Sequence, residues 1–187
     1  MTDEHAAEMP DDPRLLARTG APGFFIEHAY EASFDVPVAR ERLWAWLNDP
    51  DTFVKGQVWP FRVEFVEGTG IHGGSGFEPG VLNVHHGPGL NVAGVIVEID
   101  PGDDGKGRFR DLAYYYGSFA LSPRLIRPTR LRFWLDDAAE NGATRLRVRV
   151  DSLTRKSWAG LWTRAQDVFW KRFFRWTIRS AVERRSR

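Results

Sequence analysis

The pattern of apolar and polar residues first becomes regular in residues 30–36. There every second side chain is apolar and the side chains between them are polar, which is typical of a strand with one buried face. Pro37 cannot donate a backbone hydrogen bond to a neighbouring strand and ends this one. In residues 38–48 apolar residues recur at helical spacing and predict a helix, and a second short helix is expected to run through Lys55.

Six more strands, separated by turn-forming residues, are predicted before the C-terminal segment. We expect them at residues 61–67, 81–86, 92–100, 108–119, 129–136 and 144–152. The Asn141-Gly142 pair between the last two is a strong hairpin signal. Because short turns rather than helices join consecutive strands, the sequence indicates an antiparallel sheet.

The last element is a long amphipathic helix, expected over residues 158–184 with Ser157 as its N-cap. Its main apolar strip consists of Trp158, Trp162, Ala165, Phe169, Phe173, Trp176 and Ser180. A smaller strip beside it consists of Trp170, Phe174 and Ile178. We expect the main strip to pack on the sheet, as core and in part as the lining of a ligand cavity. The smaller strip would then be free for a hydrophobic dimer contact, for packing against the N-terminal segment or for docking on a membrane surface, and we favour the first two.

The composition is that of one globular domain with many aromatic residues. The chain of 187 residues contains no Cys, which excludes disulfides, thiolate metal sites and cysteine nucleophiles. Residues 1–22 are acidic and lack periodicity, so we expect a flexible tail before a single domain over residues 23–187. There is no signal-like leader and no long apolar run. We therefore expect a cytoplasmic protein without a transmembrane segment.

Two segments of the sequence resemble a known superfamily. Residues 32–44 form a strand broken by Pro37 into an aromatic-bearing helix, an Asn-Asp-Pro turn follows at residues 48–50, and residues 144–150 lead into the long helix. This order, over residues 29–185, is similar to that of the START/Bet v 1-like (SRPBCC) superfamily, which includes polyketide cyclase/dehydrase-like proteins. The resemblance implies an α+β helix-grip fold. In it a curved seven-stranded antiparallel sheet, with two short helices after the first strand, packs against a long C-terminal helix around an apolar cavity. It carries over no catalytic residue.

Charge is divided unevenly along the chain. Residues 1–105 hold 6 basic and 18 acidic side chains, whereas residues 106–187 hold 20 basic and 7 acidic ones. In the helix-grip fold the first strand lies beside the last, so Glu31 and Asp35 would face the arginines of residues 145–149. We therefore predict an outer face of the sheet on which charges pair with one another. A binding surface for an anionic partner is the alternative.

Two local motifs suggest chemistry that their surroundings do not support. Residues 68–73 match G-x-G-x-x-G, but residues 74–80 cannot form the helix on which a nucleotide phosphate would rest. We expect a loop there, either a gate at the cavity mouth or a plain connector. His85 and His86 are neighbours on a strand and point to opposite faces, so they cannot chelate one metal together. We therefore expect no cofactor and no metal site.

Asp111 is the most informative polar residue of the predicted sheet. If Arg108 and Arg110 face outward, Asp111 and Tyr115 face inward. A buried carboxylate must be paired, hydrogen-bonded or protonated. With an inward histidine, for which His86 is the candidate, Asp111 and Tyr115 could act as acid and base on a ligand. The alternative is that the strand is bulged, or that Asp111 only anchors a neighbouring residue.

Three classes of function are compatible with the sequence. The first is the binding or carriage of a hydrophobic small molecule, ring-containing or acyl, between the sheet and the last helix. The residues expected to line its cavity are Trp59, Tyr115, Phe133, Trp162, Phe169 and Phe173. The second is a polyketide cyclase/dehydrase-like enzyme that uses the same cavity. The third is a protein-interaction module that uses the basic outer face, or a homodimer through Trp170, Phe174 and Ile178. Nucleic-acid binding would need exposed aromatic residues interleaved with the basic ones on one face, and Trp134 beside Arg132 is the only such hint, so no nucleic-acid partner is expected.

Overall fold

The strands and helices expected from the sequence form in the predicted order. The computed structural model describes residues 23–55, 62–66, 76–115, 117–120, 125–138 and 142–183, with side chains described up to residue 176. The chain begins with β1 (Phe25–Val36), α1 (Arg40–Asn48), α2 (Pro50–Lys55), β2 (Arg62–Val66), β3 (Leu82–Gly87) and β4 (Leu90–Asp100). It continues with β5 (Phe109–Tyr114), β6 (Phe119–Ala120), β7 (Ile126–Asp137), β8 (Thr144–Arg155), the 3-10 turn η1 (Lys156–Trp158) and α3 (Ala159–Glu183).

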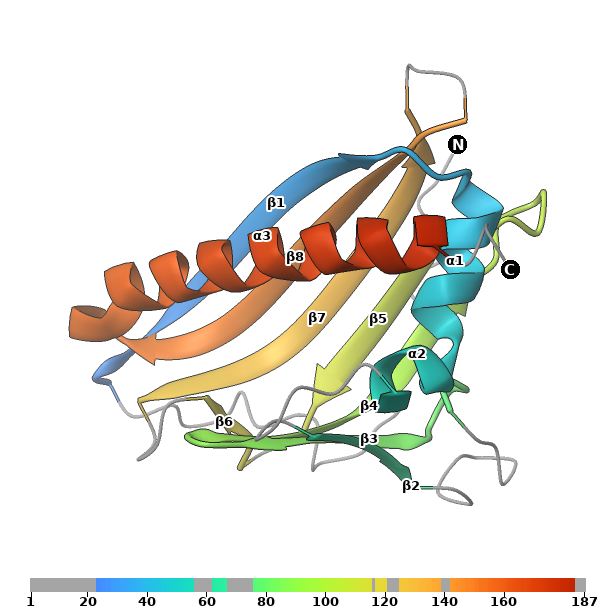
Figure 1. The fold of residues 1–187 in the computed structure, drawn as a ribbon. Helices are drawn as coiled ribbons and strands as arrows, with labels where there is room; N and C mark the ends of the chain where they lie inside the picture. Colours follow the sequence, from blue (N-terminus) through green and yellow to red (C-terminus); the bar gives the residue numbers. More distant parts are fainter. Residues whose placement is uncertain are drawn as a thin grey trace, which may run out of the picture.

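One antiparallel sheet contains all the described strands. Their order is β1-β8-β7-β5-β4-β3-β2, and the short β6 pairs with β4 and β7. The long helix α3 lies across one face of the sheet, and α1 and α2 stand at the end toward which α3 runs (Figure 1). This is the helix-grip arrangement that the sequence predicts. The first strand lies beside the last, with Glu31 opposite Arg149 and Asp35 opposite Arg145.

The expected fifth strand is divided in two, so the described part of the sheet has eight strands instead of the expected seven. β5 ends at Tyr114 and β6 begins at Phe119. Between them Gly117 has a φ of +97°, a conformation that glycine adopts without steric cost and that turns the chain. The hydroxyl of Ser118 then accepts from the N–H of Ala93 at 3.1 Å and donates to its carbonyl at 3.0 Å. This turn lets β6 pair with a different part of β4.

The main core lies between α1, the second half of α3 and strands β1, β8 and β7. Leu43 and Trp46 of α1 pack there with Phe133 of β7 and Phe174 of α3. The rings of Phe34 and Phe174 have centroids 3.8 Å apart. Each large apolar side chain that is fully buried contributes roughly 1.5–3 kcal/mol. The packing therefore fixes the C-terminal half of α3 against the sheet.

Both apolar strips of α3 contribute to the core: Trp170 and Phe174 of the smaller strip are buried in it, and Phe173 and Trp176 of the main strip pack against it. Trp170 and Phe174 are 5% and 2% exposed, so the expectation of a homodimer through these two side chains is wrong, and the side chain of Ile178 lies outside the described part. Phe169, expected to pack inward, is 55% exposed. The buried row of Trp170 and Phe174 also contains Gln166, and this polar residue made the row look less apolar in the sequence. Its Oε1 accepts from Trp170 Nε1 at 2.7 Å, so the amide is satisfied inside the protein.

Candidate functional site

Strand β5 presents Arg110 to the inner face of the sheet and Asp111 to the outer face. Arg110 is 5% exposed and lies over the buried ring of Phe133, whereas Asp111 forms an ion pair with Arg130. The prediction that Arg110 faces outward and Asp111 inward is therefore wrong. The physical reason is that Arg108 precedes the strand, so its exposure does not set the alternation of the residues within β5.

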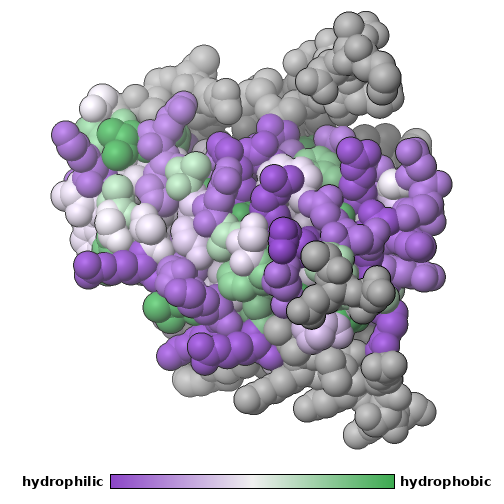
Figure 2. All heavy atoms as spheres, turned by 90° about the horizontal axis from the view of Figure 1, so that it is seen from above, coloured by the Kyte–Doolittle hydropathy of each residue, from purple (hydrophilic) through white to green (hydrophobic). Residues whose placement is uncertain are grey.

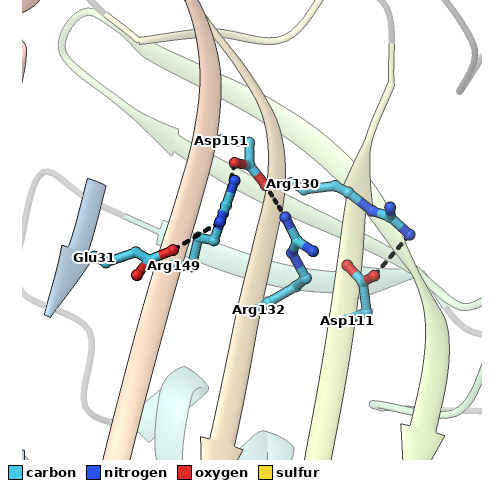
Figure 3. A network of polar contacts seen from close by, with 6 residues as sticks. All are labelled: Glu31, Asp111, Arg130, Arg132, Arg149 and Asp151. Carbon is cyan, nitrogen blue, oxygen red and sulfur yellow. Dashed lines mark hydrogen bonds and ion pairs between the residues drawn. The ribbon is translucent and has the colours of Figure 1, made fainter. Parts of the chain in front are cut away.

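Charged side chains on the outer face of β1, β8, β7 and β5 pair with one another (Figure 3). Arg149 donates from Nη1 to Glu31 Oε1 at 2.7 Å and from Nε to Asp151 Oδ1 at 2.8 Å. Asp151 also forms an ion pair with Arg132. These contacts confirm the prediction of an outer face on which charges from the two halves of the sequence neutralise one another.

Asp111 has an unusually enclosed position for a residue of the outer face. Its side chain is 3% exposed, and Oδ1 has no hydrogen-bond partner among the described residues. Burial raises the pKa of Asp111 to about 6, although Arg130 and Arg132 oppose this shift. At neutral pH it is a carboxylate paired with Arg130 on the side of the sheet away from α3. This position does not match the catalytic role expected of an inward residue.

Arg110 is the charged residue that β5 buries on the inner face. Its Nη1 donates to the carbonyl of Leu47 at 2.6 Å and to Asn48 Oδ1 at 3.0 Å, which ties the C-terminal end of α1 to the sheet. The guanidinium carbon lies 4.2 Å from the ring centroid of Phe77 and 5.1 Å from that of Phe133, within the range of a cation–π contact. Burial lowers the pKa of Arg110 to about 9, so the side chain is still a cation at neutral pH.

Two more titratable side chains, His85 and Tyr114, lie on the same face of the sheet as Arg110, and neither is one that the sequence predicted. Burial, and to a smaller extent the charges of His86 and Arg110, lowers the pKa of His85 to about 4. Burial also raises the pKa of Tyr114, an effect that Arg110 partly opposes. His86, the predicted inward histidine, instead lies 3.3 Å from Glu64 at the surface. His85 and Tyr114 are therefore uncharged at neutral pH, and they replace His86 and Tyr115 as inner-face candidates.

Gly94 makes room for the inward tyrosine. A β-carbon at Gly94 would lie 2.5 Å from the carbonyl oxygen of Ala113 and 2.9 Å from Cδ1 of Tyr114, closer than side-chain atoms normally approach. The ring of Tyr114 thus occupies the space that a side chain at residue 94 would fill. Tyr115 follows the end of β5, and its backbone N–H donates to the carbonyl of Ala93 at 2.7 Å.

Aromatic rings connect the buried guanidinium to the surface of α3. Phe77 contacts Phe65 of β2 at a centroid distance of 4.8 Å and Phe53 of α2 at 5.2 Å. Phe53 stacks on Phe173 at 6.3 Å, and Phe173 stacks on Phe169 at 6.1 Å. A continuous row of rings therefore runs from the exposed side chain on α3 to the ring that the guanidinium covers.

The exposed ring of Phe169 lies on the flank of α3 that points away from β1. The other flank contacts β1, because Thr163 Oγ1 lies 2.8 Å from His28 Nε2 and Tyr30 donates to Asp167 Oδ1 at 3.4 Å. At 3.6 residues per turn, Phe169 lies on the flank of the helix away from Thr163 and Asp167.

The residues expected to line a cavity lie in different parts of the structure. Those that surround Trp170, with ring centroids within 5.7 Å of it, are Phe133, Phe169 and Phe173. Trp162 is buried in a separate small cluster and donates from Nε1 to Ser152 Oγ at 2.9 Å. Trp59 and the glycine-rich loop at residues 68–75 lie outside the described residues. Three of the six predicted lining residues therefore lie together. They surround Trp170, which was predicted to belong to the smaller strip and not to the cavity.

The sequence offered no usable signal for Arg110 or His85 as inner residues. On β3 the inner row contains Asn83 and His85, whereas the outer row contains the more apolar Leu82 and Val84. Hydropathy alone therefore favours the opposite register for this strand. The order of strands would have been needed to reveal that His85 and Arg110 lie on one face.

In the part of the chain that the structure describes, no three His, Asp or Glu side chains are grouped so that they could hold a metal ion. Among the described helices, none combines the length and the apolar character that a membrane crossing requires.

Comparisons with known proteins identify the fold. No protein-family model matches the sequence, and neither does any curated protein. Among solved structures, Ara h 8.0201 is 19% identical, with 84% of this chain and 99% of that chain covered and a TM-score of 0.56. A point mutant of norcoclaurine synthase from Thalictrum flavum, in complex with a transition-state analogue, is 8% identical with 86% and 98% covered and a TM-score of 0.52. A conserved protein from Geobacillus kaustophilus is 11% identical with 84% and 96% covered and a TM-score of 0.57.

These similarities show that the chain has the Bet v 1-like (START) helix-grip fold, as the resemblance of the sequence implied. They hold at sequence identities of 19% or less, so they concern the backbone arrangement. Function has to be argued from the side chains of this protein, since one fold carries many functions.

Proposed function

We propose that this protein binds or carries a hydrophobic small molecule between α3 and the β3–β5 part of the sheet. The observation that carries the proposal is the 55% exposed ring of Phe169, which is joined through Phe173 and Phe53 to the rings beside Arg110. Small-molecule sites are lined mainly by apolar and aromatic side chains, and an exposed ring that continues a row of buried rings is suited to such a lining. A ring-containing or acyl ligand in this position would cover Phe169.

The division of the core supports the same proposal. One cluster surrounds Trp170 and Phe174, and a separate small one contains Ala120, Ile126 and Trp162. The side chain of His85 belongs to neither cluster. The norcoclaurine synthase with the same fold holds a transition-state analogue, so this architecture accommodates a small molecule. An apolar wall with a few polar groups is the composition that ligand sites usually have.

The proposal is tested with N-phenyl-1-naphthylamine, a neutral probe that fluoresces in apolar surroundings. We expect saturable binding to the full chain. The substitution Phe169→Ser removes one aromatic contact and should weaken binding by about three- to tenfold. Fluorescence titration of both proteins measures the effect.

The matched control is Phe24→Ser. Phe24 is 54% exposed, nearly the same as Phe169, but it precedes β1 and lies against Phe25 and the guanidinium of Arg155. This variant should bind the probe as the unsubstituted chain does. If the probe does not bind, or if both variants lose the same affinity, the proposed site is wrong.

Catalysis of the polyketide cyclase/dehydrase type is the second candidate function. The observation that favours it is the pair of uncharged groups, His85 and Tyr114, that interact with the Arg110 cation on the inner face. In this version they take the proton-transfer roles first assigned to His86 and Tyr115. Mass spectrometry of a synthetic poly-β-ketone thioester incubated with the protein should show cyclised product, lost in His85→Gln and Tyr114→Phe. No conversion by the unsubstituted protein would contradict this candidate.

A further inference from the structure

We propose that the ligand carries one negative charge, and that it is a hydrophobic monocarboxylate whose carboxylate pairs with Arg110. This inference rests on the proposed function, because it assigns the polar end of the molecule that the aromatic rings would hold. It follows from the charge on the inner face, the donors of Arg110 and a second buried donor nearby.

The inner face carries a cation without a counter-charge. No described carboxylate forms an ion pair with Arg110, which is 5% exposed. Its Nη1 instead donates to the neutral carbonyl of Leu47 and the neutral amide of Asn48. Buried charges in proteins are usually paired, because an isolated one is costly to desolvate. A ligand with one negative charge would supply the missing partner.

The described groups on the same face as Arg110 favour a ligand with a single charge. His85 and Tyr114 lie on this face and are both neutral at neutral pH. Neither therefore provides a second positive charge for a dianion such as a phosphate monoester. Each provides a polar ring that could accept or donate a hydrogen bond. The face thus matches one carboxylate rather than a more highly charged group.

The guanidinium has donors left for a planar oxyanion. Within the described residues, the two hydrogen bonds of Arg110 both start from Nη1, and none starts from Nε or Nη2. The group also lies over the ring of Phe77, with its carbon 4.2 Å from the ring centroid. An arginine held on aromatic rings with unused N–H groups is suited to bind a carboxylate through two parallel hydrogen bonds.

A second donor lies at the same end of the helix α1. The indole Nε1 of Trp46 is buried and has no hydrogen-bond partner among the described residues. Trp46 is connected to Arg110 by ring contacts, through Phe53 at 5.9 Å and from there to Phe77 at 5.2 Å. A buried N–H without an acceptor is rare in a complete structure. An oxygen-bearing ligand at this end would give it one.

The competing explanation is that Arg110 only fastens α1 to the sheet through Leu47 and Asn48. In that case its charge would not affect the choice of ligand. Two compounds with the same hydrocarbon chain and different head groups, decanoate and decan-1-ol, separate the two explanations. Each is titrated against N-phenyl-1-naphthylamine bound to the full chain, and the loss of fluorescence gives the affinity.

We expect decanoate to displace the probe at a concentration at least about tenfold lower than decan-1-ol. In Arg110→Met this advantage should disappear, because decanoate weakens while decan-1-ol changes by less than about twofold. The control Arg147→Met removes an arginine of the outer face, where the guanidinium lies 4.7 Å from the ring centroid of Trp134. It should leave the preference unchanged.

Equal displacement by the two compounds, or displacement by neither, overturns the inference, as does an Arg110→Met variant that keeps the preference for decanoate. If Arg110→Met does not fold, Arg110→Lys, which keeps the charge, must still prefer decanoate, and loss of the preference in that folded variant contradicts the proposal. Failure of the probe itself to bind refutes the proposed function. Binding of the probe without a preference for the carboxylate refutes only the charge of the ligand.

Discussion

Arg110 and Asp111 are neighbours in β5, yet the protein treats their charges in opposite ways. On the outer face Asp111 is paired with Arg130, beside a network in which Arg149 holds both Glu31 and Asp151. On the inner face Arg110 has hydrogen bonds to neutral groups and no ion pair with a described residue. The outer charges are therefore paired with one another, whereas the inner cation has no counter-charge among the described residues. Because the charges of the outer face are paired within the chain, the missing counter-charge of Arg110 points to a partner from outside it.

The strongest test of this difference is a reversal of charge on each face. Arg110→Glu would bury a carboxylate among aromatic rings and remove two hydrogen bonds, so we expect a loss of more than about 4 kcal/mol in the free energy of unfolding. Arg149→Glu would place a carboxylate beside Glu31 and Asp151, but water screens these partly exposed groups, so about 1 kcal/mol is expected. Urea unfolding measures both values. Equal losses would mean that the two faces do not differ as described.

A second test uses the pKa of Asp111, which burial raises from 3.8 to about 6. Between these two pH values the folded state holds a proton that the unfolded state has released. The carboxyl group therefore favours folding at pH 4, and this contribution of about 3 kcal/mol is lost as the pH rises through 6.

In Asp111→Asn this loss should be absent, so its free energy of unfolding should gain on that of the unsubstituted chain between pH 4 and pH 7. Urea unfolding at four pH values across this range measures the difference. Parallel curves for the two proteins would contradict the raised pKa.

The inner face should show the opposite dependence through His85, whose pKa burial lowers from 6.5 to about 4. As the pH falls below 6.5, the unfolded chain takes up a proton that the folded chain does not. Stability is therefore lost between pH 6.5 and pH 4, by about 2 kcal/mol at pH 5. His85→Gln should not show this loss, and thermal unfolding at pH 7 and pH 5 compares the two proteins. A variant as sensitive to acid as the unsubstituted chain would show that His85 is protonated in the folded state.

Periodicity predicted the elements of the fold well, because they depend on local patterns. The alternation in residues 30–36, Pro37 and the long helix all appear as expected, and so does the pairing of Glu31 with Arg149. The exceptions lie on the long helix, where Phe169 of the main strip is exposed, whereas Trp170 and Phe174 of the smaller strip are buried. Gln166 made one row of α3 look less apolar than the row beside it, although its amide is satisfied by Trp170.

The candidate site was predicted less well because its polar residues depend on distant partners. Arg110 is tolerated inside because the end of α1, some sixty residues earlier, presents the carbonyl of Leu47 to it. The local sequence of β5 gives no indication that the carbonyl of Leu47 lies beside Arg110. The aromatic members Phe133 and Phe173 were found, because large rings are expected inside wherever the fold places them.

Strand β1 has a consequence for how copies of the chain meet. It is twelve residues long, and β8 is its one neighbour among the described strands, so its other edge offers backbone groups to a further strand. Glu27, Glu31 and Asp35 are exposed along it, and polar residues cover most of the coloured surface when the molecule is seen from above, the side on which β1 lies (Figure 2). The arginines that balance two of these acids are already engaged within one chain. A second β1 laid against this edge would bring carboxylates from both copies together, which protects the longest open edge of the sheet from aggregation.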